Sequence, residues 1–192
     1  FSQSSAWALI VARAALVLQM TTSATWVGSV TFAAMIPSVL MSPISGFLAD
    51  RFDRRTVLLY AYSLNLAHNI VLAILVVTDA VVPWHLIVLA VINGSARSSQ
   101  MPPAQALLAN TIPRERLSNA VFLYQATLHG SRFLGPLLIL IVLWATMPQS
   151  YVFFVPVLLY AVGLVLIMRI RLASTGTIEA GRSMGVFLGN IA

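Results

Sequence analysis

Six long apolar runs, separated by short polar connections, constrain this chain more than any other feature. One helix needs about 20 mostly apolar residues to cross the hydrocarbon core of a bilayer. Only 8% of the residues are charged and 59% are hydrophobic, whereas soluble domains carry about 25% charged residues. We therefore predict an all-α, polytopic membrane protein with six transmembrane helices, the fourth interrupted by "SARSSQMPP". The predicted helices cover residues 4–20, 26–49, 56–77, 83–108, 117–146 and 150–170.

The connections are short, which favours antiparallel packing of successive helices in one bundle. All eleven basic residues are arginine. Eight of them lie in the second connection, in the fourth connection, or at and after the end of the sixth apolar run. The other three connections contain none. These eight are Arg51, Arg54, Arg55, Arg114, Arg116, Arg169, Arg171 and Arg182. Because arginine-rich loops stay on the inner side, we expect the 2–3 and 4–5 loops in the cytoplasm.

Several function classes are disfavoured by composition and motifs. The net charge of +6 comes from arginines scattered between apolar runs, so it indicates orientation in a lipid bilayer rather than a nucleic-acid partner. The chain has no cysteine, which excludes disulfides and thiolate metal sites. It also lacks a Walker loop, an HExxH motif and a GxSxG motif. We therefore predict no enzyme activity, no cofactor and no metal site.

The two ends of the sequence suggest a segment of a longer protein. The first residue is Phe1 rather than methionine, and the last residues turn apolar again. Residues 172–192 are rich in glycine, serine and threonine, as linkers are. We expect a six-helix transmembrane domain over residues 1–171, with its first helix clipped, followed by the start of a cytoplasmic linker over residues 172–192.

The stretch "GFLADRFDRR", residues 46–55, concentrates charge where the second helix should leave the membrane. Gly46 lies one turn before Asp50, so another backbone can approach closely there. A partly buried carboxylate needs a cation or a helix N-terminus, and arginines bind carboxylates and helix carbonyl ends. The cluster therefore predicts a latch between two helix bundles. The alternative is a basic turn that only sets orientation.

The same ten residues resemble the loop 2–3 signature of the major facilitator superfamily, with Asp53 in place of its second glycine. Residues 101–120, "MPPAQALLANTIPRERLSNA", and residues 132–138, "RFLGPLL", resemble segments of the branch that contains enterobactin-exporter-like and drug efflux proteins. The resemblance implies the N-terminal half of a transporter, built from two three-helix inverted repeats. It further implies a C-terminal six-helix half of the same polypeptide as partner, and a location in the plasma membrane (bacterial inner membrane).

By this resemblance, the chain is part of a secondary active transporter that moves a small molecule by alternating access, driven by an ion gradient, with proton-driven efflux expected. The alternatives are a lysophospholipid or lipid flippase of the same superfamily, and a non-transporting membrane scaffold or receptor. The resemblance also assigns residues to a cytoplasmic gate. These are Gly46, Asp50, Arg51, Arg54 and Arg55.

Three further arginines, Arg13, Arg97 and Arg132, lie within the apolar runs. A charge at the centre of a bilayer costs at least ~2.5–3.5 kcal/mol, and such residues usually face a cavity or a partner. At a rise of about 1.5 Å per residue, Arg13 lies about 10–12 Å from the outer end of its helix, Arg97 about 20 Å from the outer end of the fourth helix, and Arg132 about 20 Å from the inner end of the fifth. No aspartate or glutamate lies at this depth. The arginines must find anions elsewhere: in the second half of the protein, in a missing stretch of the first helix, or in an anionic substrate.

In the fourth helix, Arg97 is spaced at i, i+4 and i+7 with Asn93 and Gln100. In the fifth helix, Arg132 has the same spacing with Gln125 and His129. Each set predicts a polar stripe on one side of its helix. The predicted cavity residues are Arg13, Asn93, Arg97, Gln100, Gln125, His129 and Arg132. Alternatively, the arginines bind backbone carbonyls freed where the fourth and fifth helices break. The pair Gly135 and Pro136 is the predicted kink of the fifth helix.

Overall fold

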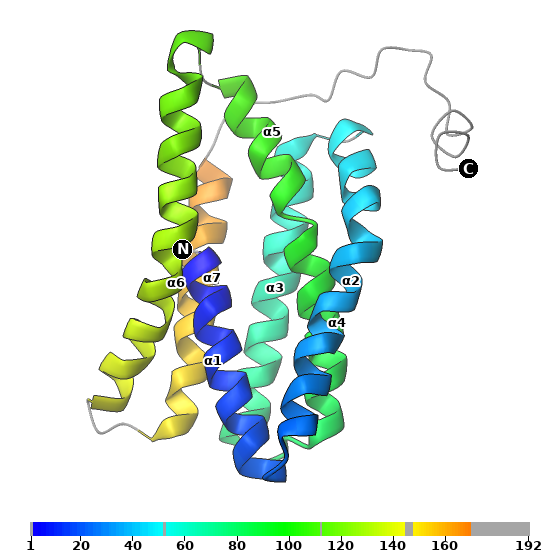
Figure 1. The fold of residues 1–192 in the computed structure, drawn as a ribbon, viewed down its shortest axis with the longest axis vertical. Helices are drawn as coiled ribbons and strands as arrows, with labels where there is room; N and C mark the ends of the chain where they lie inside the picture. Colours follow the sequence, from blue (N-terminus) through cyan, green and yellow to red (C-terminus); the bar gives the residue numbers. More distant parts are fainter. Residues whose placement is uncertain (1, 52, 112, 145–147, 170–192) are drawn as a thin grey trace.

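The computed structural model describes residues 2–51, 53–111, 113–144 and 148–169, and every regular element among them is a helix. Figure 1 shows these helices standing side by side as one elongated bundle. The α-helices are α1 (Ser2–Thr21), α2 (Ala24–Arg51), α3 (Arg54–Val77), α4 (Pro83–Ser98), α5 (Met101–Thr111), α6 (Leu117–Trp144) and α7 (Phe154–Arg169). Two short 3₁₀ helices, η1 (Arg114–Arg116) and η2 (Gln149–Phe153), precede α6 and α7. The expected linker over residues 172–192 lies outside the described residues.

Five segments are long and apolar enough to cross a membrane: α1, the first part of α2, α3, α6, and η2 together with α7. The sixth predicted span is formed by α4 and α5 in succession, with 16 and 11 residues. Neither reaches about 20 residues alone, but α5 continues from α4 beyond a turn (Figure 1). At 1.5 Å per residue, the two together are long enough to span ~30 Å of hydrocarbon. The predicted six-span bundle is therefore confirmed, with the fourth span divided.

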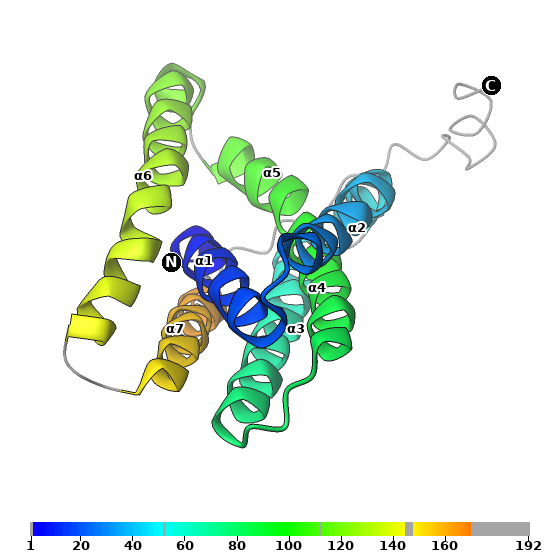
Figure 2. The same ribbon diagram turned by 60° about the horizontal axis from the view of Figure 1, so that its bottom comes forward.

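The most extensive contacts between helices repeat with a twofold pattern. Helix α2 packs on α4 as α6 packs on α1, and α3 packs on α4 as α7 packs on α1, while α3 and α7 also meet each other. Figure 2 shows α1 with α6 and α7 on one side and with α2, α3 and α4 on the other. Exchanging α1–α3 for α4–α7 leaves this set of contacts unchanged. That is the arrangement expected of two three-helix repeats.

Two glycines allow the closely packed pairs to form. A Cβ on Gly94 of α4 would overlap the backbone oxygen of Ala34 on α2, and a Cβ on Gly135 of α6 would overlap that of Ser4 on α1. Small residues at such positions let helix backbones approach in a membrane, where dispersion contacts and hydrogen bonds replace the hydrophobic effect. The α2–α4 and α1–α6 interfaces therefore depend on these glycines.

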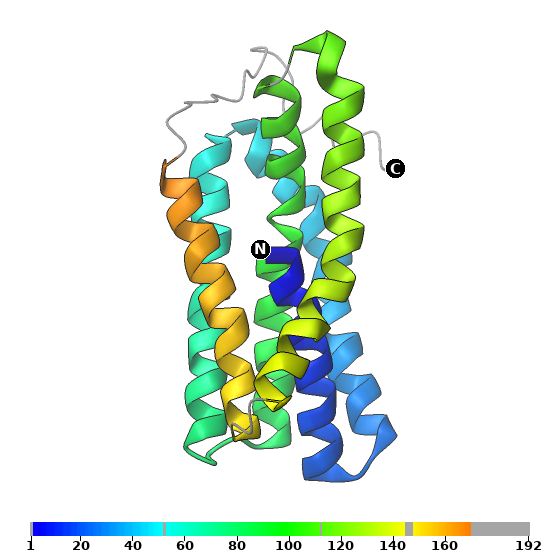
Figure 3. The same cartoon turned by 90° about the vertical axis from the view of Figure 1, so that its left-hand side faces the viewer.

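Helix α6 bends in its second half, as Figure 3 shows. Pro136 lies inside this helix, and a proline there removes the hydrogen bond to the carbonyl of the residue four positions earlier, which is Arg132. Gly135 next to it packs directly on α1. The bend therefore has a defined cause in the pair Gly135–Pro136, the position at which the sequence predicts a kink.

Candidate functional site

A cavity of about 730 Å³ lies between α1, α2, α4 and α5, and we call it the arginine cavity. Arg13 contributes from α1, and Asn93 and Arg97 contribute from α4. Ser38 of α2 and Gln105 of α5 add polar groups. The remaining lining is mostly apolar or aromatic. It is formed by Trp7, Ile10, Ala14, Val17, Val27, Val30, Thr31, Ala34, Met35, Gly94, Ser98, Met101 and Pro102.

Arg13 is the most deeply buried charged side chain on the wall of this cavity, with 4% of its surface exposed. Its Nη1 atom has no hydrogen-bond partner among the described residues. Arg97 lines the same cavity, so the two positive charges repel each other across it. A buried charge is costly unless it is paired, so this cavity wall carries a positive charge without a counter-charge in the described part of the chain.

The acidic residues of the chain lie far from the arginine cavity along the sequence. They are Asp50, Asp53, Asp79, Glu115 and Glu179. Asp50 lies at the end of α2, directly before a connection. Asp53, Asp79 and Glu115 lie within connections, and Glu179 lies beyond α7. Within residues 1–192, the transmembrane segments thus bring no carboxylate to mid-depth to neutralise the two arginines.

Asn93 is held in place by a hydrogen-bonded ladder that begins on α3. Its side-chain amide donates to Oδ1 of Asn65 over 2.8 Å. The Asn65 amide donates to the carbonyl of Ala61, and the Asn69 amide donates to the carbonyl of Asn65. All three asparagines are buried. Because a buried hydrogen-bonded network rigidifies its members, α3 fixes the wall of the cavity although it does not line it.

The structure separates Gln100 from Arg13, Asn93 and Arg97. The turn at Ser99 and Gln100, between α4 and α5, breaks the helical phase that the sequence stripe assumes. Gln100 is buried and lines a smaller cavity of about 190 Å³, together with Tyr62 and Tyr124. The Tyr62 hydroxyl donates to Oγ of Ser2 over 2.9 Å. Gln100 thus lies next to α3 and α6 rather than in the arginine cavity.

The predicted cavity residues of α6 also lie apart from Arg13 and Arg97. Gln125, His129 and Arg132 are exposed in the described chain and line none of the cavities named here. The guanidinium carbon of Arg132 lies 5.2 Å from the centre of the Trp7 ring, a cation–π geometry. Trp7 in turn contributes to the arginine cavity. Arg132 therefore contacts Trp7 from outside the arginine cavity.

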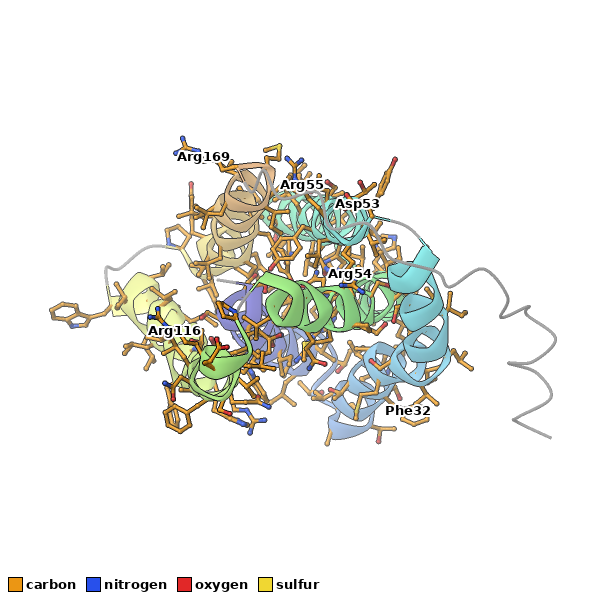
Figure 4. All side chains as sticks on the ribbon, turned by 90° about the horizontal axis from the view of Figure 1, so that it is seen from above. Phe32, Asp53, Arg54, Arg55, Arg116 and Arg169 are labelled. Atoms are coloured by element: carbon orange, nitrogen blue, oxygen red, sulfur yellow. The ribbon has the colours of Figure 1, made fainter. Side chains whose placement is uncertain are left out.

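The end of the bundle that carries the 2–3 and 4–5 connections also carries the basic side chains. Figure 4 looks onto this end and labels Arg54, Arg55, Arg116 and Arg169. Asp53 caps α3 there, because its Oδ2 accepts from the backbone N–H and the hydroxyl of Thr56 at 3.0 and 2.9 Å. An aspartate before a helix is a usual N-cap, which explains why it fits where the family signature has glycine.

Arg55 connects the start of α3 to the end of α7. Its Nη2 donates to the carbonyl of Met168 over 2.7 Å, and its Nε donates to that of Ile167 over 3.4 Å. Those carbonyls belong to the last turn of α7, where a cation is favourable. The other predicted gate residues Gly46, Asp50 and Arg51 lie in the last turns of α2, and their side chains are outside the described part. Reasoning from sequence missed the Arg55 contact, since no local pattern brings α7 to α3.

The described residues contain no group of three or more acidic or histidine side chains that could hold a metal ion. What the geometry offers is a mid-depth cavity with two guanidinium groups, an oriented amide and a largely apolar lining. Such a cavity can bind a small molecule by charge and shape.

Comparison with known proteins agrees with this architecture. A family model described as a transmembrane secretion effector, of the major facilitator superfamily, matches residues 1–179. The staphyloferrin A transporter of Staphylococcus aureus is 24% identical over 115 residues, which cover 59% of this chain and 29% of that protein. An uncharacterized transporter of the same superfamily from Bacillus subtilis, YfiS, is 29% identical over 105 residues, or 54% of this chain and 24% of that protein.

The matched regions thus span less than a third of either relative. The family match covers nearly the whole chain, and six apolar spans with a twofold repeat of contacts agree with it. The chain therefore belongs to the transmembrane secretion effector family of the major facilitator superfamily and corresponds to an N-terminal half.

Proposed function

We propose that the whole protein exports a small molecule across the bacterial inner membrane by alternating access, using the proton gradient. The observation that carries this proposal is the arginine cavity, an apolar-lined site with two guanidinium groups at mid-depth, in a bundle that belongs to a transporter family. Secondary transporters of this kind bind substrate near the midplane, between two repeats that rock against each other. The family description, a secretion effector, favours export.

The arginine-rich end of the bundle is the cytoplasmic end in this proposal, because positively charged loops remain inside. Asp50, Arg51 and Arg54, with Gly46, form the gate that closes this end against the second half of the protein. The structure adds one part to that picture. Arg55 binds the last turn of α7 at the start of α3, so we expect the two helices next to the gate to move together.

A lipid flippase is the second candidate, and one observation favours it. A cavity of about 420 Å³, with a largely apolar lining, lies between α1, α3, α6 and η2. Its lining includes Leu16, Ile139 and Phe153, and a cavity of this chemistry suits an acyl chain. A scaffold or receptor role is the third candidate and predicts no flux at all.

Metabolite profiling of cells tests export even though the transported compound is unidentified. Cells that lack the full-length gene should retain at least one compound that cells with the gene release into the medium. The Asp50→Asn protein, inserted at wild-type level, should behave like the deletion. The compound is then loaded into proteoliposomes with and without an imposed proton gradient. Identical media from all three strains would refute export, and enrichment of a lysophospholipid would favour the flippase.

A further inference from the structure

We propose that Arg13 and Arg97 form an anion subsite, and that the transported molecule carries a carboxylate, phosphate or sulfonate group on an apolar or aromatic body. This inference rests on the proposed function, because it names the substrate class of the same cavity. It also selects two of the three membrane arginines and leaves Arg132 out.

The state of Arg13 is the first reason. This residue is 4% exposed, faces the arginine cavity, and has a buried Nη1 without a hydrogen-bond partner among the described residues. An unpaired buried cation is unfavourable. The nearby charge of Arg97 increases the cost, since like charges repel more strongly away from water. An anion placed between the two groups would remove both penalties.

The second reason is the absence of an internal counter-charge. The five acidic residues of the sequence all lie in or next to connections or beyond α7, so the transmembrane segments within residues 1–192 bring no carboxylate to mid-depth. Arginine presents a planar fork of donors that matches carboxylate and phosphate oxygens. A negative group must therefore come from the substrate, from the second half of the transporter or from the chain before Phe1. Binding of dyes of opposite charge separates the substrate from the two protein sources.

The remaining lining indicates the body of the ligand. Trp7, Ile10, Met35 and Met101 present aromatic, aliphatic and thioether surface to the cavity. Flexible methionines adapt to different shapes, and an indole ring stacks on planar groups. The amide nitrogen of Asn93 donates a hydrogen bond to Asn65. The side-chain oxygen of Asn93 is therefore left as an acceptor. The cavity thus suits an amphiphilic acid better than a sugar or a polyol.

Arg132 has a different environment, although its sequence position suggests the same role. Its guanidinium lies over the Trp7 ring at 5.2 Å, and the side chain is exposed on α6. It does not line the arginine cavity. We therefore expect Arg132 to support Trp7 rather than bind the anion.

The test uses two dyes with the same ring system and opposite charge, carboxyfluorescein and rhodamine 123. The full-length protein is placed in nanodiscs of phosphatidylcholine, and dye binding is followed by fluorescence anisotropy without any ion gradient. The wild-type protein should bind carboxyfluorescein at least about tenfold more tightly than rhodamine 123. If a carboxylate of the second half already neutralises the arginines, the two dyes will bind equally, and the proposal fails.

Variants assign the preference to the cavity. Arg97→Gln should remove the preference for the anionic dye, whereas Arg97→Lys, which keeps the charge but loses the fork, should keep part of it. Arg169→Gln, at the exposed end of α7, is the matched control for loss of one positive charge and should bind like wild type. Arg13→Lys and Arg13→Gln repeat the comparison at the buried position. An Arg97→Gln protein with wild-type preference would overturn the assignment.

Competition distinguishes a free acid from a lipid headgroup. Displacement of carboxyfluorescein by 1-naphthoate, but not by lysophosphatidylglycerol, assigns the subsite to a soluble acid, and the reverse assigns it to an anionic lipid. Displacement by neither would overturn the proposal. The outcome is also separate from that for export. A protein that binds the acid but releases nothing in the metabolite experiment refutes export alone, whereas one that releases only cations refutes the anion subsite alone.

Discussion

Replacement of Gly94 by alanine tests the packing of α4 on α2, on which the wall of the arginine cavity depends. The added Cβ would overlap the backbone oxygen of Ala34 and would lie 3.0 Å from its carbonyl carbon and 3.3 Å from its Cα. These are backbone atoms, so no change of rotamer relieves the overlap, and the two helices must separate. Overpacking of this kind costs about 1–3 kcal/mol.

The opposing term is helix propensity, because alanine favours a helix over glycine by about 1 kcal/mol. Gly28 and Gly130 measure that term directly, since an added Cβ at either position has no neighbour within 4 Å. Gly28→Ala and Gly130→Ala should therefore be neutral or slightly stabilising. Gly94→Ala should be about 1–3 kcal/mol less stable than these controls.

The measurement is the free energy of unfolding of the full-length protein, by titration of mixed micelles with dodecyl sulfate under tryptophan fluorescence. Dye binding by the same variants reports on the cavity, because Gly94 lies on its wall. A Gly94→Ala protein as stable as Gly130→Ala would refute the close α2–α4 contact. It would also remove the basis for placing Asn93 and Arg97 on one wall.

Three further outcomes are expected. Asp50→Asn should reduce export at least tenfold while leaving membrane insertion intact, as fluorescence of a fused tag would show; wild-type flux would contradict a gate at this position. Arg55→Ala should lower the free energy of unfolding by about 1 kcal/mol, because it removes the cation from the last carbonyls of α7, whereas Arg116→Ala, an exposed arginine directly before α6, should not; equal effects would argue against the cap. In a cysteine-free background, Thr22→Cys should react with an impermeant maleimide added outside intact cells and Arg116→Cys should not; the opposite labelling would invert the assigned orientation.

The locations of the helices were predictable from the sequence, because burial in lipid requires long apolar runs and leaves charge only between them. Asp53 illustrates a local rule, since an aspartate three residues before Thr56 is an N-cap signal that needs no tertiary information. The division of the fourth span at Ser99 and Gln100 was also foreseeable from "SARSSQMPP". The sequence did not show how that division changes the direction in which the side chains beyond it point.

The candidate site was predictable only in part. Arg13, Asn93 and Arg97 line one cavity, whereas the expected stripe continued through Gln100. A stripe assumes an unbroken helix, and the turn before α5 rotates Gln100 towards α3 and α6. A helical pattern states which residues share a face, but it does not state which neighbour that face meets.

The sequence by itself determined the environment of this chain, its six crossings and the end that carries the arginines, because hydropathy and charge act residue by residue against the bilayer. Only the tertiary structure decided which buried charges share a cavity and which helices the glycines and Arg55 bring into contact. Those relations depend on the packing of α1 against α6 and of α2 against α4. They join residues that are distant along the chain, and local patterning carries no information about such pairs.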